Sequence, residues 1–156
     1  MTATDDLPEA LAAIVEDFTA VPAADRLQLL LEFSRDLPDL PERYADHPEL
    51  LEPVPECQSP IFLVTEVDGT GDDARVSLFF SAPQESPTTR GFAGILHEGL
   101  DGLTAAEVLA VPNDVPQRLA LAEAVSPLRL RGMAGMLARI KRQVTERATV
   151  AGEHPA

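Results

Sequence analysis

The sequence predicts an α+β fold in which helices cover one face of a small antiparallel sheet. Two segments rich in Val, Ile and Phe flank a glycine-containing turn in the middle of the chain, and apolar residues at helical spacing dominate both ends. Strands grouped between helical ends are typical of this class. With 156 residues, 45% of them hydrophobic, we expect a single domain over residues 1–156. Its core should extend from about residue 7 to 149, with frayed ends.

The N-terminal part is predicted to form two helices. The first, over residues 7–18, places apolar side chains on one side, and Asp5 or Asp6 is available as its cap. Pro22 then opens a second helix that extends to about Leu37, because proline suits the first turn of a helix.

A loop and a hairpin follow. Six prolines between residues 38 and 60 predict a loop with one helical turn near Glu42. Residues 61–67 and 75–81 are predicted strands, and the acidic, glycine-containing segment between them, residues 68–73, is the turn of an antiparallel hairpin.

The second half of the chain is predicted to be helical. Residues 88–100 return to helical spacing, and Thr104 with Glu107 forms a capping box that opens a short helix. Prolines then interrupt the pattern, with a short helical turn at residues 117–119. A Ser-Pro pair, a good cap and first position, starts a long helix over residues 126–149.

Charge and composition exclude several classes of function. With 26 acidic and 12 basic residues the chain carries a formal charge of −14, and its six Phe and one Tyr offer little for stacking on bases, so we expect no nucleic-acid partner. No apolar run approaches a membrane span and no signal peptide opens the sequence, so we expect a cytoplasmic protein with no membrane partner. Arginines predominate over the single lysine, which indicates a GC-rich bacterial genome.

The single cysteine, Cys57, is the candidate reactive group. It ends a proline-stiffened loop just before the first strand, where reactive groups are commonly displayed, although a lone cysteine is also often a small buried hydrophobe. One cysteine and three widely spaced histidines provide no metal-ligand motif, so we expect no metal or cofactor. Glu56 disfavours the thiolate and no His or Lys lies nearby in sequence, so the thiol suits a reaction that a partner activates.

Three blocks around this cysteine resemble the SufE-like sulfur acceptor family. They are Cys57-Gln58-Ser59 entering a strand, Arg90-Gly91 opening a helix, and Ser126-Pro127-Leu128-Arg129 followed by Gly132-Met133. Their order and spacing match the family over roughly residues 10–145. The chain departs from the family pattern at Glu56, where the family usually has glycine, at Pro60 and at Leu128.

The resemblance implies a SufE/IscU-like fold and a role in sulfur transfer. Cys57 would accept persulfide sulfur from a pyridoxal-phosphate-dependent, SufS-like cysteine desulfurase, stimulate that enzyme, and pass the sulfur to a SufBCD-like iron–sulfur scaffold complex. Gln58 and Ser59 would shape the loop or bind the partner, or simply satisfy loop amides. Arg129 would orient the loop or a partner carboxylate, or form a surface salt bridge. Such a carrier has no cofactor and no independent turnover.

Alternatives to the carrier remain. A single-cysteine thiol enzyme, such as a peroxidase, would need a depressed pKa of Cys57 and a basic residue within hydrogen-bond reach of its sulfur. An adaptor with an inert, buried Cys57 is the other alternative, whereas a cluster scaffold fails on the cysteine count. For the carrier, we expect Ile61, Phe62 and the last helix to shelter the persulfide in the free protein.

Overall fold

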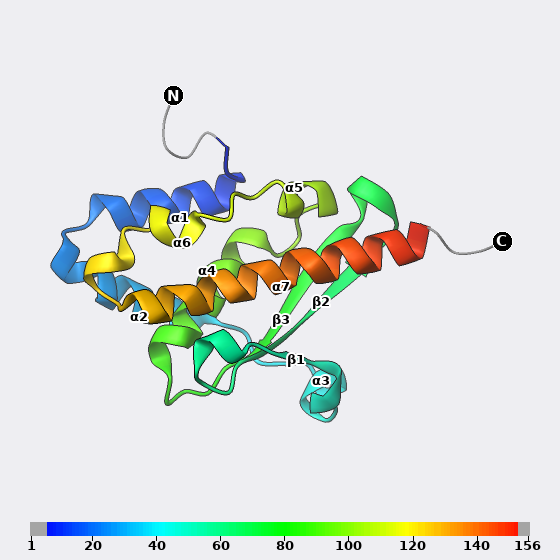
Figure 1. The fold of residues 1–156 in the computed structure, drawn as a ribbon, viewed down its shortest axis with the longest axis horizontal. Coiled ribbons are helices and arrows are strands. Elements are labelled where there is room, and N and C mark those ends of the chain that lie inside the picture. Colours follow the sequence, from blue (N-terminus) through cyan, green and yellow to red (C-terminus); the bar gives the residue numbers. More distant parts are fainter. Residues whose placement is uncertain (1–5, 153–156) are drawn as a thin grey trace.

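A computed structural model describes residues 6–152, with side chains as far as Ala148. It confirms the α+β class, with a three-stranded antiparallel sheet in the order β1-β2-β3 and helices before and after it (Figure 1). Fraying is predicted before about residue 7 and after residue 149. Residues 1–5 and 153–156 lie outside the described residues, whereas residues 150–152 continue the last helix, which ends at Gly152. The elements are α1 (Glu9–Ala20), α2 (Arg26–Asp36), α3 (Glu42–Ala45), β1 (Glu52–Pro53), β2 (Phe62–Asp68), β3 (Arg75–Ser81), α4 (Pro87–Leu100), α5 (Ala105–Leu109), α6 (Val115–Arg118) and α7 (Pro127–Gly152).

The start of the chain differs from the prediction in its cap. Asp6 does not cap α1, because its carboxylate forms an ion pair with Arg118 at 2.6 Å, and α1 begins at Glu9 directly after Pro8. Asp5 lies outside the described residues. The second helix also begins later than predicted, since residues 23–25 form a separate 3₁₀ turn before Arg26.

Of the two short helices predicted between residues 104 and 119, the first has the predicted cap and the second begins earlier than predicted. The Thr104–Glu107 capping box is present, with the Glu107 N–H donating to the Thr104 hydroxyl at 3.2 Å. The turn predicted at residues 117–119 instead covers Val115–Arg118. Pro116 falls in its first turn, where the missing N–H costs no hydrogen bond, so the proline opens this helix rather than breaking it.

The proline-rich segment holds more structure than a loop. Besides α3 it contains β1, whose Glu52 and Pro53 pair with Leu63 and Phe62 of β2. A proline is tolerated there because β1 is an edge strand. This pairing anchors the start of the loop that carries Cys57 to the sheet.

The two faces of the sheet are covered unequally. Alternate residues of β3 enter the main core, which α1, α2, α4 and α7 complete, and α7 runs across β2 (Figure 1). The opposite face carries a smaller cluster, in which Tyr44 of α3 packs with Val64 and Phe79. Helices therefore cover mainly one face, as predicted, and the proline-rich segment covers part of the other.

Side chains of α7 form hydrogen bonds with the backbone of β2 beyond the two residues that pair with β1. The Thr65 N–H donates to Gln143 Oε1 at 2.7 Å, and Arg147 donates to the Thr65 carbonyl. Gln143 also donates to Glu52 at 3.0 Å. The buried Gln143 thus fixes α7 against both β1 and β2. None of the described helices combines the length and apolar character needed to cross a bilayer.

Candidate functional site

Cys57 lies in a self-contained loop between β1 and β2. We define the cysteine loop as residues 54–61; its neck is closed by the Val54 N–H, which donates to the Ile61 carbonyl at 3.0 Å. Within it the Cys57 N–H donates to the Val54 carbonyl and the Gln58 N–H to the Pro55 carbonyl, both at 3.1 Å. All the backbone hydrogen bonds of residues 55–60 among the described residues stay inside the loop. Its backbone can therefore keep its conformation if the loop moves as a unit.

A strained residue follows the cysteine. The 3₁₀ turn Pro55–Cys57 ends at Gln58, whose φ of 58° lies in the left-handed region. A residue with a side chain adopts this conformation at a cost of order 1 kcal/mol. This conformation turns the chain sharply from the 3₁₀ turn toward β2, and the strained residue, Gln58, directly follows Cys57.

Two glycines of α7 make room for the cysteine loop. A Cβ on Gly132 would lie 3.0 Å from Cys57 Sγ and 3.1 Å from Cys57 Cα. A Cβ on Gly135 would lie 3.0 Å from the Glu56 carboxyl carbon. Because residues three apart share a helix face, the two glycines form one flat surface on which the loop lies. Cys57 is consequently only 6% exposed and belongs to the main core.

Ion pairs tie the loop to the same helix. Arg139 Nη1 donates to Glu56 Oε2 at 2.8 Å, and Arg139 Nε lies 3.3 Å from Glu52 Oε2. Arg142 also binds Glu52. The hydrogen bond from Arg139 holds the pKa of Glu56 below its usual value. Burial raises the pKa of Glu52, but hydrogen bonds from Arg142 and Gln143 outweigh it and leave that pKa lowered.

The surroundings favour the protonated thiol. Burial and, to a smaller extent, the Glu56 carboxylate raise the pKa of Cys57, Arg139 acts in the opposite direction, and the resulting pKa is about 12. Among the described residues no basic side chain hydrogen-bonds to the sulfur. A peroxidase-like thiol enzyme needs the reverse on both counts. In this conformation Cys57 is therefore a protected thiol, not an activated nucleophile.

The other predicted loop residues lie at the surface of the site. Gln58 is exposed, and the Ser86 hydroxyl donates to the Ser59 hydroxyl at 3.0 Å, which ties the loop to the start of α4. In the part of the chain that the structure describes, neither side chain forms a hydrogen bond with a loop amide. The hydroxyl pair is instead a second side-chain tether of the loop.

Arg129 is exposed one helical turn before Gly132. Its N–H donates to the capping hydroxyl of Ser126 at 3.3 Å, whereas its guanidinium forms no ion pair with any described residue. The predicted alternative of a surface salt bridge is therefore absent from residues 6–148. Leu128 beside it is 41% exposed, so an apolar and a cationic side chain lie at the surface of α7, about one turn before the glycine that faces Cys57.

The Arg90-Gly91 block serves the packing of α4. Arg90 donates to the carbonyls of Ser34 at 2.8 Å, Ala82 at 2.7 Å and Leu37 at 3.3 Å, which joins the end of α2 to the end of β3. A Cβ on Gly91 would lie 2.6 Å from the Leu30 carbonyl oxygen, so α2 and α4 are in close contact there. This block is structural and contributes no group to the thiol.

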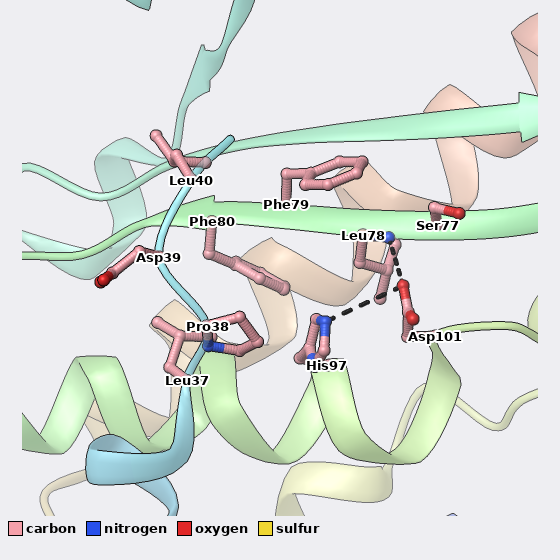
Figure 2. Close-up of a pocket in the computed structure, with 10 residues that line it drawn as sticks. All are labelled: Leu37, Pro38, Asp39, Leu40, Ser77, Leu78, Phe79, Phe80, His97 and Asp101. Carbon is pink, nitrogen blue, oxygen red and sulfur yellow. Dashed lines mark hydrogen bonds and ion pairs between the residues drawn. The ribbon is translucent and has the colours of Figure 1, made fainter. Parts of the chain in front are cut away.

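A pocket of about 150 Å³ lies elsewhere, between α4, β3 and residues 37–40 (Figure 2). His97 Nε2 is 3.9 Å from Asp101 Oδ1, and the Leu78 N–H donates to the same oxygen at 2.8 Å. Asp101 thereby accepts a hydrogen bond from a backbone N–H on the open side of β3, which is an edge strand. Cys57 does not line this pocket. Within the described residues no three His, Cys, Asp or Glu side chains gather as a possible metal site.

The chain is similar to known proteins over most of its length. The family profile described as "SufE: Fe-S metabolism associated domain" matches residues 12–144. An uncharacterized SufE-like protein of Mycobacterium tuberculosis is 57% identical over 94% of this chain and 99% of its own length. An uncharacterized SufE-like protein of Rhizobium meliloti is 27% identical over 88% of this chain and 96% of its own length. The solution structure of a hypothetical protein from Thermus thermophilus matches with a TM-score of 0.75 and 38% identity, covering 92% of this chain and 98% of that one.

Proposed function

The chain belongs to the SufE family of Fe–S metabolism associated domains, and on this basis we propose that it is a sulfur carrier. Cys57 would take persulfide sulfur from a cysteine desulfurase, stimulate that enzyme, and deliver the sulfur to an iron–sulfur scaffold complex. One observation carries the proposal: the only cysteine lies in a loop whose backbone hydrogen bonds are all internal. Such a loop can shelter its thiol against α7 and still present it to a partner.

The transfer step is a thiol–persulfide exchange. The Cys57 thiolate attacks the terminal sulfur of the desulfurase persulfide, a new sulfur–sulfur bond forms on Cys57, and the bond in the donor breaks. The thiol proton of Cys57 passes to solvent, and the departing desulfurase thiolate takes up a proton. No net oxidation occurs. The desulfurase recovers its free cysteine, which accounts for the stimulation.

The buried conformation suits the resting carrier. Its thiol is protonated and covered, so it reacts slowly with oxidants. Lifting the loop from α7 removes the burial that raises the pKa, and the pKa then moves toward the ordinary value of about 8.5. The partner thus supplies the activation by opening the loop. The free Cys57 thiol must stay reduced in order to accept sulfur, and we therefore infer a cytoplasmic location.

The shelter differs in one residue from the predicted one. Ile61 is buried in the same core cluster as Cys57, and Gly132 of α7 contacts the thiol directly. Phe62, however, belongs to the cluster on the opposite face of the sheet. Successive residues of a strand point to opposite faces, so Ile61 and Phe62 do not cover one thiol together.

An adaptor with an inert cysteine is the second candidate function. The burial of Cys57 and its pKa of about 12 favour this reading, because a core cysteine has the same properties. An adaptor would act on its partner through its surface alone. Its effect would then be indifferent to the sulfur atom.

Desulfurase turnover separates the two functions. We would measure alanine production by a cognate desulfurase from free cysteine, with the wild-type protein and with Cys57→Ser, after checking that both have the same melting temperature. A carrier loses its stimulation in the variant, since the hydroxyl accepts no persulfide sulfur. Stimulation that persists in Cys57→Ser would reject the carrier in favour of the adaptor.

A further inference from the structure

We propose that Glu56 and Arg139 are positioning residues that hold the cysteine loop closed on α7 and so limit access to Cys57. The inference rests on the proposed function for its biological meaning, but its physical content concerns the free protein alone. Glu56 also marks one of the departures of this sequence from the family pattern, so the device is a feature of this chain rather than of the resemblance.

The geometry makes the pair a tether of the loop. Glu56 directly precedes Cys57, so a displacement that exposes the sulfur also draws the Glu56 carboxylate away from Arg139. The partner guanidinium is fixed independently of the loop, since Arg139 also donates to the Gly135 carbonyl at 3.2 Å and lies 3.3 Å from Glu52. Glu52 in turn stays anchored through β1, Arg142 and Gln143. Opening therefore breaks this ion pair, together with the Ser86–Ser59 hydrogen bond, and leaves the Arg139 anchor in place.

Gly135 allows the pair to form at short range. A Cβ at position 135 would already lie 3.0 Å from the Glu56 carboxyl group, so any side chain there would collide with that group. The glycine lets the carboxylate lie along the helix and reach Arg139 one turn further on. Gly132 seats the thiol and Gly135 seats the tether, on one face of α7.

The pair is partly exposed, with the Glu56 side chain 43% and the Arg139 side chain 21% accessible, so salt screens it. An exposed pair contributes little to stability. A weak tether is what a loop needs if docking is to open it, because partner contacts then have little to overcome. The tether therefore sets how often the loop opens, not whether the protein folds.

Substituting each partner distinguishes a tether from a purely electrostatic effect on the sulfur. Glu56 disfavours the thiolate and Arg139 favours it. If the loop stayed in place, Glu56→Gln would accelerate alkylation of Cys57 and Arg139→Gln would slow it. If the pair holds the loop, both variants accelerate it, since either one releases the tether. The sign of the Arg139→Gln effect decides between the two.

The experiment measures alkylation of Cys57 by iodoacetamide, a neutral probe, at neutral pH in low and high KCl. We expect each single variant to react about threefold faster than wild type, the double variant to add little, and KCl to accelerate only the wild type. Glu146→Gln is the matched control, because it breaks the exposed Arg142–Glu146 pair on the same helix without touching the loop. Melting temperatures verify that every variant is folded.

Three results would overturn the inference: slower or unchanged alkylation in Arg139→Gln, a wild-type rate indifferent to KCl, or an equal acceleration in Glu146→Gln. Because the assay contains no desulfurase, its outcome is independent of the sulfur-carrier test. Failure of sulfur transfer with this alkylation pattern intact would reject the function and keep the tether.

Discussion

At the scale of single residues, opposing influences meet on the sulfur of Cys57. Burial and the Glu56 carboxylate favour the protonated thiol, Arg139 favours the thiolate, and the pKa settles near 12. A thiol of this kind is safe at rest and reacts only after its surroundings change. The reactivity of Cys57 therefore depends on where the loop lies rather than on a neighbouring base.

The raised pKa predicts a pH dependence of stability. An unfolded thiol titrates near pH 8.5, so the folded state retains the proton to higher pH than the unfolded chain. The stability that this thiol contributes is complete below that pH and is lost as the pH rises toward 12. Relative to Cys57→Ala, the wild-type free energy of unfolding should fall by roughly 2 kcal/mol between about pH 8 and pH 10 in urea denaturation. A difference that stays constant over this range would contradict the burial.

The sequence indicated the reactive residue but not its contacts. Cys57 stands out because no second cysteine exists. The ion pair beside the cysteine could not be predicted in the same way. Arg139 lies 83 positions from Glu56, and only the packing of the loop on α7 brings the two residues together. The alternation of side chains along a strand already separates Phe62 from Ile61, so their placement on opposite faces follows from the sequence alone.

At the scale of elements, close packing of the cysteine loop on α7 depends on the absence of a side chain at position 132. Gly132→Ala places a methyl group 3.1 Å from the Cys57 backbone, and backbone cannot give way as a side chain does. We expect a lower melting temperature and faster alkylation of Cys57, because the loop must lift from the helix.

Gly135→Ala is the matched control for that substitution. There the nearest atoms belong to the Glu56 carboxyl group, which can rotate away, so the loss of stability should be smaller. Helix propensity favours alanine equally at both positions, so the difference between the variants reports the contact alone. An equal or higher melting temperature in Gly132→Ala than in Gly135→Ala would contradict the packing.

Elements with a clear period were predictable, and those defined by tertiary pairing were not. The hairpin and the long helices follow from spacing, and the short helix α5 follows from its capping residue Thr104. β1 is two residues long, contains Pro53, and exists only because it pairs with β2, so no local pattern marks it. Gly132 was part of the resemblance, whereas the matching role of Gly135 emerges only once the loop is seen to lie on α7.

At the scale of the whole molecule, the net charge of −14 contrasts with a cationic group beside the site. The guanidinium of Arg129 is exposed next to Leu128, one turn from the glycine that seats Cys57. We propose that this group contacts a carboxylate of the partner desulfurase.

Charge reversal tests this contact. In Arg129→Glu, the concentration of this protein needed for half-maximal stimulation of the desulfurase should rise about tenfold. The rise should be smaller at high salt, because a charge at the rim of an interface acts mainly on association. Titration of alanine production with each variant measures it. Arg75→Glu is the matched control, because Arg75 lies opposite Asp68 in the strand register, at the end of the hairpin far from the cysteine loop. The end near the loop is where Phe62 lies opposite Ser81. Equal losses in both variants would show a general charge effect instead of a contact.

The most direct test of the whole account is a single-turnover transfer. A desulfurase loaded with persulfide and freed of excess cysteine is mixed with this protein, and the intact mass of the protein is measured. The account predicts a gain of one sulfur atom, located on the peptide that contains Cys57 and removed by a thiol reductant. A desulfurase that loses its persulfide sulfur while this chain gains none, or gains it equally in Cys57→Ser, would contradict the account.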